Sequence, residues 1–363
     1  MRIKKLKLLN FRNYTEKEFE FKEKINLISG ANGSGKSSLL EAIHILSLGR
    51  SFRTSVDQTL VHRHENQLFL HGIFQAYDDR IVDIKFGLEQ KKTIKINDAA
   101  IPRLSDLIGR IPIILFLDKD IDILEGPPSG RRRFLDLLFS QIDPEYLMNL
   151  VQYHKILDQR NHYLKSNHQD PLLMETLNQN LVLSGVKIIQ LRMQYIGEFT
   201  GSLSRVLAQY DDPQLPAVQL QYRSSVFPDY KINRYDMDIL SSCFHSQLLE
   251  TRLREEKYKY TLIGPHRDDL FFLNQDGSRL VDYSSRGERR LFMLFVKFAE
   301  MEFISCYKKD PAIVLMDDIL LELDKKNKDF ITDSIAKITC QSFITTVDEN
   351  DYQNLPDKNM IQL

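Results

Sequence analysis

The sequence predicts an α/β protein that also carries a second, mostly helical lobe. Two observations predict the α/β part. A glycine-rich segment, residues 30–37, lies between an apolar run and a helical pattern, and another apolar run ends in Asp317 and Asp318. The third observation is helical periodicity over about 131–208, which predicts the other lobe. At 363 residues the chain exceeds the usual size of a single core, which agrees with two lobes.

Residues 30–37 read GANGSGKS and match the phosphate-binding loop pattern G-x-x-x-x-G-K-[ST]. The run 25–29 predicts a buried strand before the loop, and the spacing over 38–46 predicts a helix after it. In this context backbone N–H groups point at phosphate oxygens, and the helix N-terminus favours negative charge. We expect Lys36 to reach the β- and γ-phosphates with a catalytic role, and Ser37 to bind Mg²⁺. The residues predicted to bind a nucleoside triphosphate are Gly30, Ala31, Asn32, Gly33, Ser34, Gly35, Lys36 and Ser37.

The apolar run 312–316 predicts a second buried strand, and it ends in Asp317 and Asp318. We expect Asp317 to hold Mg²⁺ through water. We expect Asp318 to lie beside the γ-phosphate and to orient or deprotonate the attacking water as a catalytic residue. The alternative is an acidic strand end that caps the following helix.

Ser285 and Gly287 open a predicted helix over about 287–304. A serine and a glycine at a helix start can form an anion site or a simple cap. About 30 residues before the carboxylate-ended strand, they resemble the signature motif of ABC-type ATPases, which completes the nucleotide site of a partner subunit. The fold class is therefore predicted as an ABC-type ATPase head, a P-loop NTPase. That resemblance places Asp324 at the D-loop, where the chain crosses the dimer interface.

The domain boundaries follow the change from strand to helix patterns. We expect residues 1–125 to form the N-terminal part of the ATPase lobe, 126–258 the inserted helical lobe, and 259–363 the C-terminal part. The insert has no sustained heptads, so no long coiled-coil arm is expected. Strands and turns predicted beside those above are an antiparallel meander over 66–97, strands at 111–116, 260–263, 269–273 and 342–346, and a hairpin turn at 274–277.

Composition narrows the partners only slightly. The chain has 49 Lys and Arg against 50 Asp and Glu, so its net charge neither indicates nor excludes a nucleic-acid partner. The cysteines at 243, 306 and 340 lack metal-site spacing and are expected to be buried thiols in a reducing cytosol. No apolar run is long enough to cross a membrane, and the start lacks a signal-peptide core. We expect a soluble, cytoplasmic protein without a membrane partner.

Six sequence blocks carry a further resemblance: residues 9–14, 30–36, 48–54, 130–136, 264–270 and 317–324. Together they resemble the RecF family of bacterial recombination mediators. The resemblance covers essentially the whole chain, because the blocks keep the family's order. It implies a homodimer that forms with ATP and Mg²⁺ and binds single-stranded and double-stranded DNA, or their junctions, at gaps. It also implies action with RecO and RecR to load RecA in recombinational repair, support of replication and SOS induction, and weak DNA-stimulated ATP hydrolysis used as a switch.

The chain departs from family patterns at three places. Leu321 stands where the family usually carries a small residue, and Leu117-Asp118 replaces a more usual Ser-Pro in the Q-loop segment. Thr345 and Thr346 occupy the region where many ABC transporters carry a switch histidine, which predicts slow hydrolysis.

Several other side chains have two interpretations. Arg12 and Asn13 are expected to bind the nucleotide, because they resemble the segment that approaches it in Rad50-like heads. Arg50 and Arg53 follow the P-loop helix and face either nucleotide or DNA. The arginines 131–133 either bind DNA phosphates or form internal salt bridges. The segment 258–260, Tyr-Lys-Tyr, favours strand packing over a base-stacking platform.

Three rival functions follow from the same motifs. A transporter-type ABC subunit should show a coupling helix and a switch histidine, and neither is evident. A scaffold that binds ATP only as a structural ligand would differ in ATP turnover. A short-armed SMC-like structural protein is disfavoured by the missing coiled coil.

Overall fold

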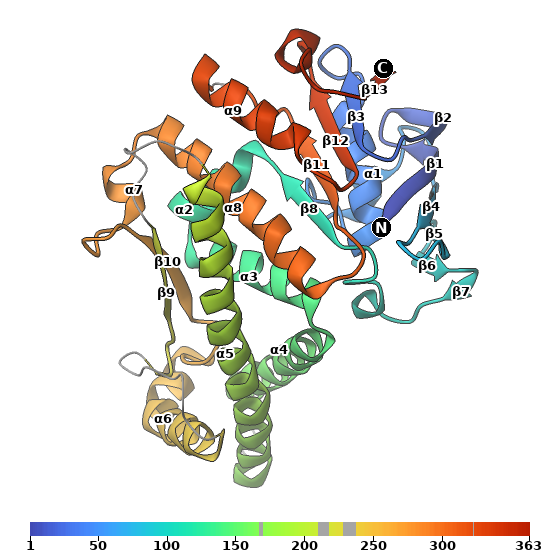
Figure 1. Ribbon diagram of the computed structural model, residues 1–363. Coiled ribbons are helices and arrows are strands. Elements are labelled where there is room, and N and C mark those ends of the chain that lie inside the picture. Colours follow the sequence, from blue (N-terminus) through green and yellow to red (C-terminus); the bar gives the residue numbers. More distant parts are fainter. Residues whose placement is uncertain (167–169, 210–217, 228–236, 322) are drawn as a thin grey trace. The chain divides into compact units, whose positions relative to one another are not determined.

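The computed structural model describes residues 1–166, 170–209, 218–227, 237–321 and 323–363. The chain divides into two compact units, drawn in Figure 1: Met1–Asp120 together with Arg286–Leu363, and Ile121–Ser285. The inserted unit therefore continues to Ser285, beyond the predicted end at 258. The reason is a long-range strand pair, because β10 (Asp269–Leu273) pairs with β9 (Gln219–Arg223) inside the inserted segment.

The centre of the first unit is a parallel sheet in the order β13-β3-β12-β11-β8. The P-loop strand β3 and the carboxylate strand β11 lie on either side of β12, so their carboxyl ends meet at one edge of the sheet (Figure 1). All five residues of β3 are buried, as the apolar run predicted. The strands are β3 (Ile25–Ser29), β8 (Ile113–Phe116), β11 (Ile313–Asp317), β12 (Ser342–Thr346) and β13 (Asn359–Gln362).

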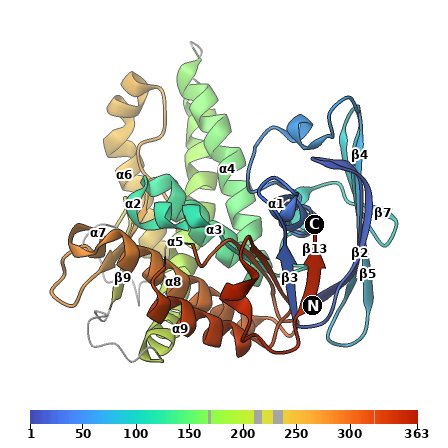
Figure 2. The same ribbon diagram turned by 90° about the horizontal axis from the view of Figure 1, so that it is seen from above.

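A second sheet of the first unit is antiparallel and confirms the predicted meander. Its buried face packs on α1 (Lys36–Leu48), which follows the P-loop, as Figure 2 shows. The approach is close at Gly72, where a Cβ would lie 2.8 Å from the Leu46 side chain. The strands are β1 (Arg2–Phe11), β2 (Tyr14–Glu20), β4 (Leu68–Gln75), β5 (Ile81–Leu88), β6 (Lys92–Ile96) and β7 (Ala99–Ala100).

Two longer helices complete the first unit: α8 (Arg286–Tyr307) and α9 (Lys325–Ala336). Helix α8 is buried along most of its length and packs on β8, where the rings of Phe298 and Phe116 meet edge to face at 5.5 Å. This packing holds α8 against the sheet, and the predicted signature residues lie at its N-terminal end.

The second unit is mainly helical. Asp143 and Asp170 cap the helices that follow them, and a proline occupies the first turn of each, as expected at helix starts. The helices are α2 (Asp122–Glu125), α3 (Pro128–Ile142), α4 (Pro144–Lys165), α5 (Pro171–Ala208), α6 (Met237–Tyr258) and α7 (Leu280–Tyr283).

The strand predicted at 260–263 is wrong. The backbone N–H of Thr261 donates to the side chain of Asn161, and that of Leu262 donates to Glu255, both at 2.8 Å. Side chains thus take the backbone donors that a strand ladder would need. The turn at 274–277 is present, but it leads only to an isolated bridge between Leu273 and Arg279.

Two further expectations are settled by burial. Arg131 is 5% exposed and pairs with Asp269 at 2.7 Å, so this arginine of the triplet forms an internal ion pair. The prediction of buried thiols holds for Cys340 and is wrong for Cys306, which is exposed. Among the described residues no helix is both long and apolar enough to cross a membrane.

Candidate nucleotide-binding site

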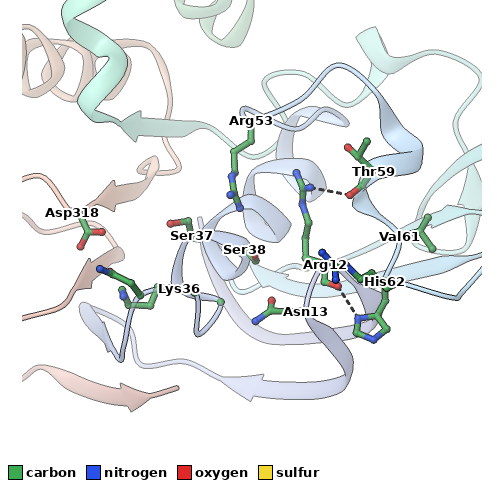
Figure 3. A pocket seen from close by; sticks show the side chains of 14 residues that line it. Arg12, Asn13, Lys36, Ser37, Ser38, Arg53, Thr59, Val61, His62 and Asp318 are labelled. Carbon is green, nitrogen blue, oxygen red and sulfur yellow. Dashed lines mark hydrogen bonds between the residues drawn. The ribbon is translucent and has the colours of Figure 1, made fainter.

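A pocket of about 590 Å³ opens in the first unit at the carboxyl edge of the parallel sheet. Figure 3 shows Lys36 and Asp318 toward one end, Thr59, Val61 and His62 toward the other, and Arg12 between them. The residues that line it are Arg12, Asn13, Asn32, Gly33, Gly35, Lys36, Ser37, Ser38, Arg53, Thr59, Val61, His62, Arg63 and Asp318.

The P-loop joins β3 to α1 as the motif predicted. Gly35 is the N-cap of α1 and has a φ of 114°, in the region that favours glycine. A Cβ at Gly35 would lie 2.7 Å from both Asn13 Nδ2 and the Tyr14 hydroxyl. The same neighbours support the loop, because Asn13 Nδ2 donates to the carbonyl of Ser34 at 3.0 Å and Tyr14 donates to that of Gly35 at 3.2 Å.

Lys36 lies at the start of α1 and is only 5% exposed. Its ammonium group donates to the carbonyl oxygens of Gly30 at 2.8 Å and Ala31 at 3.1 Å. The positive charge of Lys36 therefore lies against the P-loop backbone, on the side of the pocket where Figure 3 shows Asp318. This is a favourable position for binding an anionic group in the loop.

Ser37 and Asp317, the two residues predicted to hold Mg²⁺, lie in direct contact. The Ser37 hydroxyl donates to Asp317 Oδ1 at 2.9 Å. The hydroxyl of Thr345, which is fully buried on β12, donates to the same oxygen at 2.8 Å. Both hydroxyls bind the same carboxylate oxygen, Oδ1. Among the described residues no side chain donates a hydrogen bond to the other oxygen, Oδ2. A hydroxyl and a free carboxylate oxygen are the hard ligands that Mg²⁺ takes.

Asp318 follows directly and lines the pocket. Its φ of 48° places it in the left-handed region, and its N–H donates to the Thr345 hydroxyl at 3.0 Å. Partial burial and the charge of Asp317 raise the pKa of Asp318, while Lys36 opposes that rise. A carboxylate with a raised pKa accepts a proton more readily, which suits a base beside the pocket.

Arg12 is anchored at the centre of the pocket by Glu41, a residue that sequence reasoning missed. Glu41 lies on α1, is fully buried and accepts two hydrogen bonds from Arg12, at 2.8 Å and 2.6 Å. It also accepts a hydrogen bond from Ser51, and Arg53 lies 3.7 Å away. The sequence does contain one indication: Glu41 is an acid within an apolar helical run, and a buried carboxylate needs hydrogen-bond or charged partners.

The far end of the pocket comes from residues 59–63, which sequence reasoning also missed. This segment is bound to the end of β1: Arg12 N–H donates to Leu60 O and His62 N–H donates to Asn10 O, each at 2.8 Å. The His62 ring adds a contact of 2.7 Å between Nδ1 and Arg12 O. No local pattern in 59–63 predicts these hydrogen bonds, because the residues that this segment pairs with lie about 50 positions earlier in the chain.

The predicted signature and D-loop residues do not line this pocket. Ser285 precedes α8 and Gly287 lies in its first turn, and both are exposed. Apart from the adjoining backbone, no heavy atom of the described residues lies within 4 Å of the position that a Gly287 Cβ would take. Asp324 caps α9 by accepting from the N–H of Asn327 at 2.8 Å. Glu322, in the matching block, lies outside the described residues.

Comparisons with known proteins agree with this geometry. Residues 2–362 match the sequence model of the family described as "RecF/RecN/SMC N terminal domain". The chain is 36% identical over 361 residues to the DNA replication and repair protein RecF of Streptococcus pneumoniae, covering 98% of this chain and 95% of that protein.

Solved structures give the same result. The recombination mediator protein RecF-ATP of the RecFOR pathway superposes with a TM-score of 0.88 at 32% identity, covering 96% of this chain and 92% of that one. A Smc head bound to the C-winged helix domain of ScpA has a TM-score of 0.53 at 17% identity, covering 99% and 93%, which shows the shared ABC-type ATPase head fold. The chain belongs to the RecF family of DNA replication and repair proteins.

Proposed function

We propose that this protein binds Mg²⁺ and ATP in the pocket and uses them to form a DNA-binding homodimer in replication and repair. The observation that carries the proposal is the meeting of Lys36, Ser37, Asp317 and Asp318 at one edge of the sheet, around a pocket of about 590 Å³. The solved RecF structures named with ATP support the choice of nucleotide.

The donor set around Asp317 fits a magnesium ion. Ser37 Oγ offers a hard oxygen to the ion itself, and Asp317 Oδ2 offers one to a water bound to the ion. Mg²⁺ keeps several waters and takes its other ligands from phosphates. When bound, the ion would neutralise charge on the phosphate oxygens. The residues of the chain then have separate tasks: Lys36 binds the phosphates, and Asp318 orients the attacking water and accepts its proton.

The second half of the site comes from another copy of the chain in this proposal. Ser285 and Gly287 are exposed at the N-terminus of α8, a 22-residue helix whose dipole favours an anion there. Two subunits would pair head to tail, each offering these residues to the γ-phosphate held by the other. Asp324 would lie at the same interface while it caps α9.

Family membership supports the biological role. We infer that the closed dimer binds gapped DNA at single-strand/double-strand junctions and acts with RecO and RecR so that RecA is loaded, in recombinational repair and SOS induction. Slow hydrolysis through Asp318 would open the dimer and release DNA, so ATP works as a switch. The place of action would be the cytoplasm.

Light scattering after gel filtration, with ATP, ADP and a gapped duplex, tests the dimer and DNA binding together. The wild type should shift to dimer mass with ATP and not with ADP. Ser285→Arg should abolish the shift because the larger cation blocks the site. Ser305→Arg is the matched control, since Ser305 is exposed at the opposite end of α8. A Ser285→Arg protein that still dimerises with ATP would refute the shared site.

ATP turnover separates this proposal from a scaffold that holds ATP as a structural ligand. Turnover should be slow, should increase with DNA, and should be lost in Lys36→Arg while the fold is retained. Undiminished turnover in Lys36→Arg would show that the lysine has no catalytic role. A wild type that binds ATP without hydrolysing it, with and without DNA, would favour the scaffold.

A further inference from the structure

Four side chains at the end of α6 form a continuous stack of cations and rings. The rings of Tyr258 and Tyr260 stack with their centroids 6.0 Å apart. Lys257 Nζ lies 6.0 Å from the Tyr258 ring, and Arg267 Cζ lies 4.9 Å from the Tyr260 ring. We call these four residues the cation–aromatic ladder. All belong to the second unit, far along the chain from the P-loop.

The ladder is open to solvent. Tyr258 is 50% exposed and Tyr260 is 40% exposed, and Lys257, Lys259 and Arg267 are exposed as well. Large aromatic side chains usually bury most of their surface, so two exposed and stacked tyrosines mark a binding surface. The interpretation of the segment 258–260 as strand packing is therefore wrong, since no strand forms there.

The charge around the ladder is positive, although the whole chain is nearly neutral. Residues 252–267 contain five Lys or Arg side chains and two acids. Both acids are paired, Glu255 with Arg160 and Glu256 with Arg252. In the part of the chain that the structure describes, no carboxylate pairs with the remaining cations of this segment, which are Arg254, Lys257, Lys259 and Arg267.

A buried network holds the ladder in place. Arg160 is 2% exposed, and it donates to Glu255 at 2.6 Å and to the Thr261 hydroxyl at 2.8 Å. The carbonyl of Thr261 accepts a hydrogen bond from Arg267 Nη2 at 3.2 Å. Lys259 turns the chain with a φ of 63°, so that Tyr258 and Tyr260 come onto one stack. The surface is thus largely ordered before any ligand arrives.

We propose that the cation–aromatic ladder binds single-stranded DNA. A nucleobase can stack on the Tyr258 ring once the flexible Lys257 side chain turns to a phosphate, or on the planar guanidinium of Arg267. The lysines beside the rings attract the phosphates of the DNA backbone. The inference rests on the proposed function and adds to it a site for the unpaired strand of a gapped duplex.

This chemistry distinguishes one nucleic acid from another. In a duplex the faces of the bases are covered by their neighbours, so the tyrosine rings gain nothing there, whereas the cations still attract phosphates. Stacking is also tolerant of sequence, because every base has a flat face. The ladder should therefore favour single strands over blunt duplex and show little base preference.

Fluorescence anisotropy of a labelled oligo-dT and a labelled blunt duplex tests the proposal. Tyr258→Ala/Tyr260→Ala should weaken oligo-dT binding roughly 10-fold or more and leave duplex affinity within about twofold. Tyr258→Phe/Tyr260→Phe keeps both rings and should restore binding. Tyr77→Ala is the matched control, because Tyr77 is 83% exposed in the other unit.

Salt dependence and a tryptophan reporter provide independent measurements. Lys257→Gln/Lys259→Gln should reduce the slope of log affinity against log salt by about 0.7 for each phosphate that these lysines neutralise in the wild type. The chain has no tryptophan, so Tyr258→Trp places a single reporter in the ladder, and oligo-dT should quench its fluorescence.

The outcomes separate the two proposals. If the wild type dimerises with ATP, but the wild type and the double alanine variant bind oligo-dT equally tightly, the proposed role of the ladder is refuted and the proposed function is not. Equal losses of affinity for oligo-dT and duplex would also overturn it, because they would indicate a general change of the surface. A wild type that neither dimerises with ATP nor binds gapped DNA would overturn the proposed function itself.

Discussion

Thr345 should control how the site uses Mg²⁺, because one hydroxyl binds both the Asp317 carboxylate and the backbone N–H of Asp318. It donates to Asp317 Oδ1 at 2.8 Å and accepts from the N–H of Asp318 at 3.0 Å. Thr345→Val keeps the shape of the side chain and removes both bonds. A hydrogen bond to a carboxylate is worth about 1.5–3 kcal/mol, and an orphaned N–H costs about 1–3 kcal/mol. Since Asp317 and Asp318 are partly exposed, we take the lower end of each range and expect the free energy of unfolding to fall by about 2.5 kcal/mol.

In Thr345→Val, the affinity for ATP in the presence of Mg²⁺ should fall more than the affinity for ATP alone. Calorimetric titration of ATP, once with Mg²⁺ and once with a chelator, gives the factor by which the metal strengthens binding. In this variant the Asp317 carboxylate keeps only the hydrogen bond from Ser37 and is held less firmly, which should reduce that factor about tenfold, and turnover should fall with it. Urea denaturation measures the accompanying loss in the free energy of unfolding.

Two variants of the same strand make the result decisive. Thr345→Ser keeps the hydroxyl and should retain most of the Mg²⁺ response. Thr346 is also buried on β12, but its hydroxyl donates to Asp348 O at 2.8 Å. Thr346→Val should therefore destabilise the fold without altering that response. If Thr345→Val and Thr346→Val destabilise the protein equally and both keep the wild-type Mg²⁺ response, the positioning role of Thr345 is wrong.

Three further predictions concern the ionisable residues Glu41, Asp318 and His266. Glu41→Ala leaves Arg12 without its buried partner and should lower the free energy of unfolding by about 3 kcal/mol in urea titrations, whereas the exposed Glu18→Ala should change it by less than about 0.5 kcal/mol. The raised pKa of Asp318 should place the acid limb of kcat/KM for ATP above pH 3.8, and the absence of that limb would exclude Asp318 as the base. Burial lowers the pKa of His266 to about 3, so the unfolded chain binds a proton that the folded chain does not. The free energy of unfolding should fall as pH drops from 6.5 toward 3, by up to about 1.4 kcal/mol per pH unit, and His266→Gln should flatten this dependence.

The P-loop end of the pocket could be predicted from the sequence because its signals are local. The apolar run 25–29, the glycines of the loop and the helical spacing after Lys36 each describe a few consecutive residues, and the structure has the same strand, loop and helix. Asp317 could be placed beside Ser37 because parallel strands that end in a P-loop and in carboxylates meet at one edge.

The boundary of the second unit could not be predicted in this way. Pairing of β9 with β10 joins residues about 50 positions apart, and nothing in either segment identifies the other. Residues 260–263 have the composition of a strand, yet Asn161 and Glu255 take two of their N–H groups. Tertiary contacts overrode local propensity there, and they also exposed the tyrosines of the ladder.

Glu41 and Thr345 show what a sequence reveals of a site and what it withholds. Each is a polar residue in a buried segment, so each must have hydrogen-bond partners. The sequence implies that partners exist but not that they are Arg12 for one and Asp317 with Asp318 for the other. These partners make the pocket a connected unit: α1 is tied to the end of β1 through Glu41, and β11 to β12 through Thr345. A substitution at either residue should therefore disturb several functional groups together, which is why their effects on binding should exceed those of equally buried polar residues elsewhere.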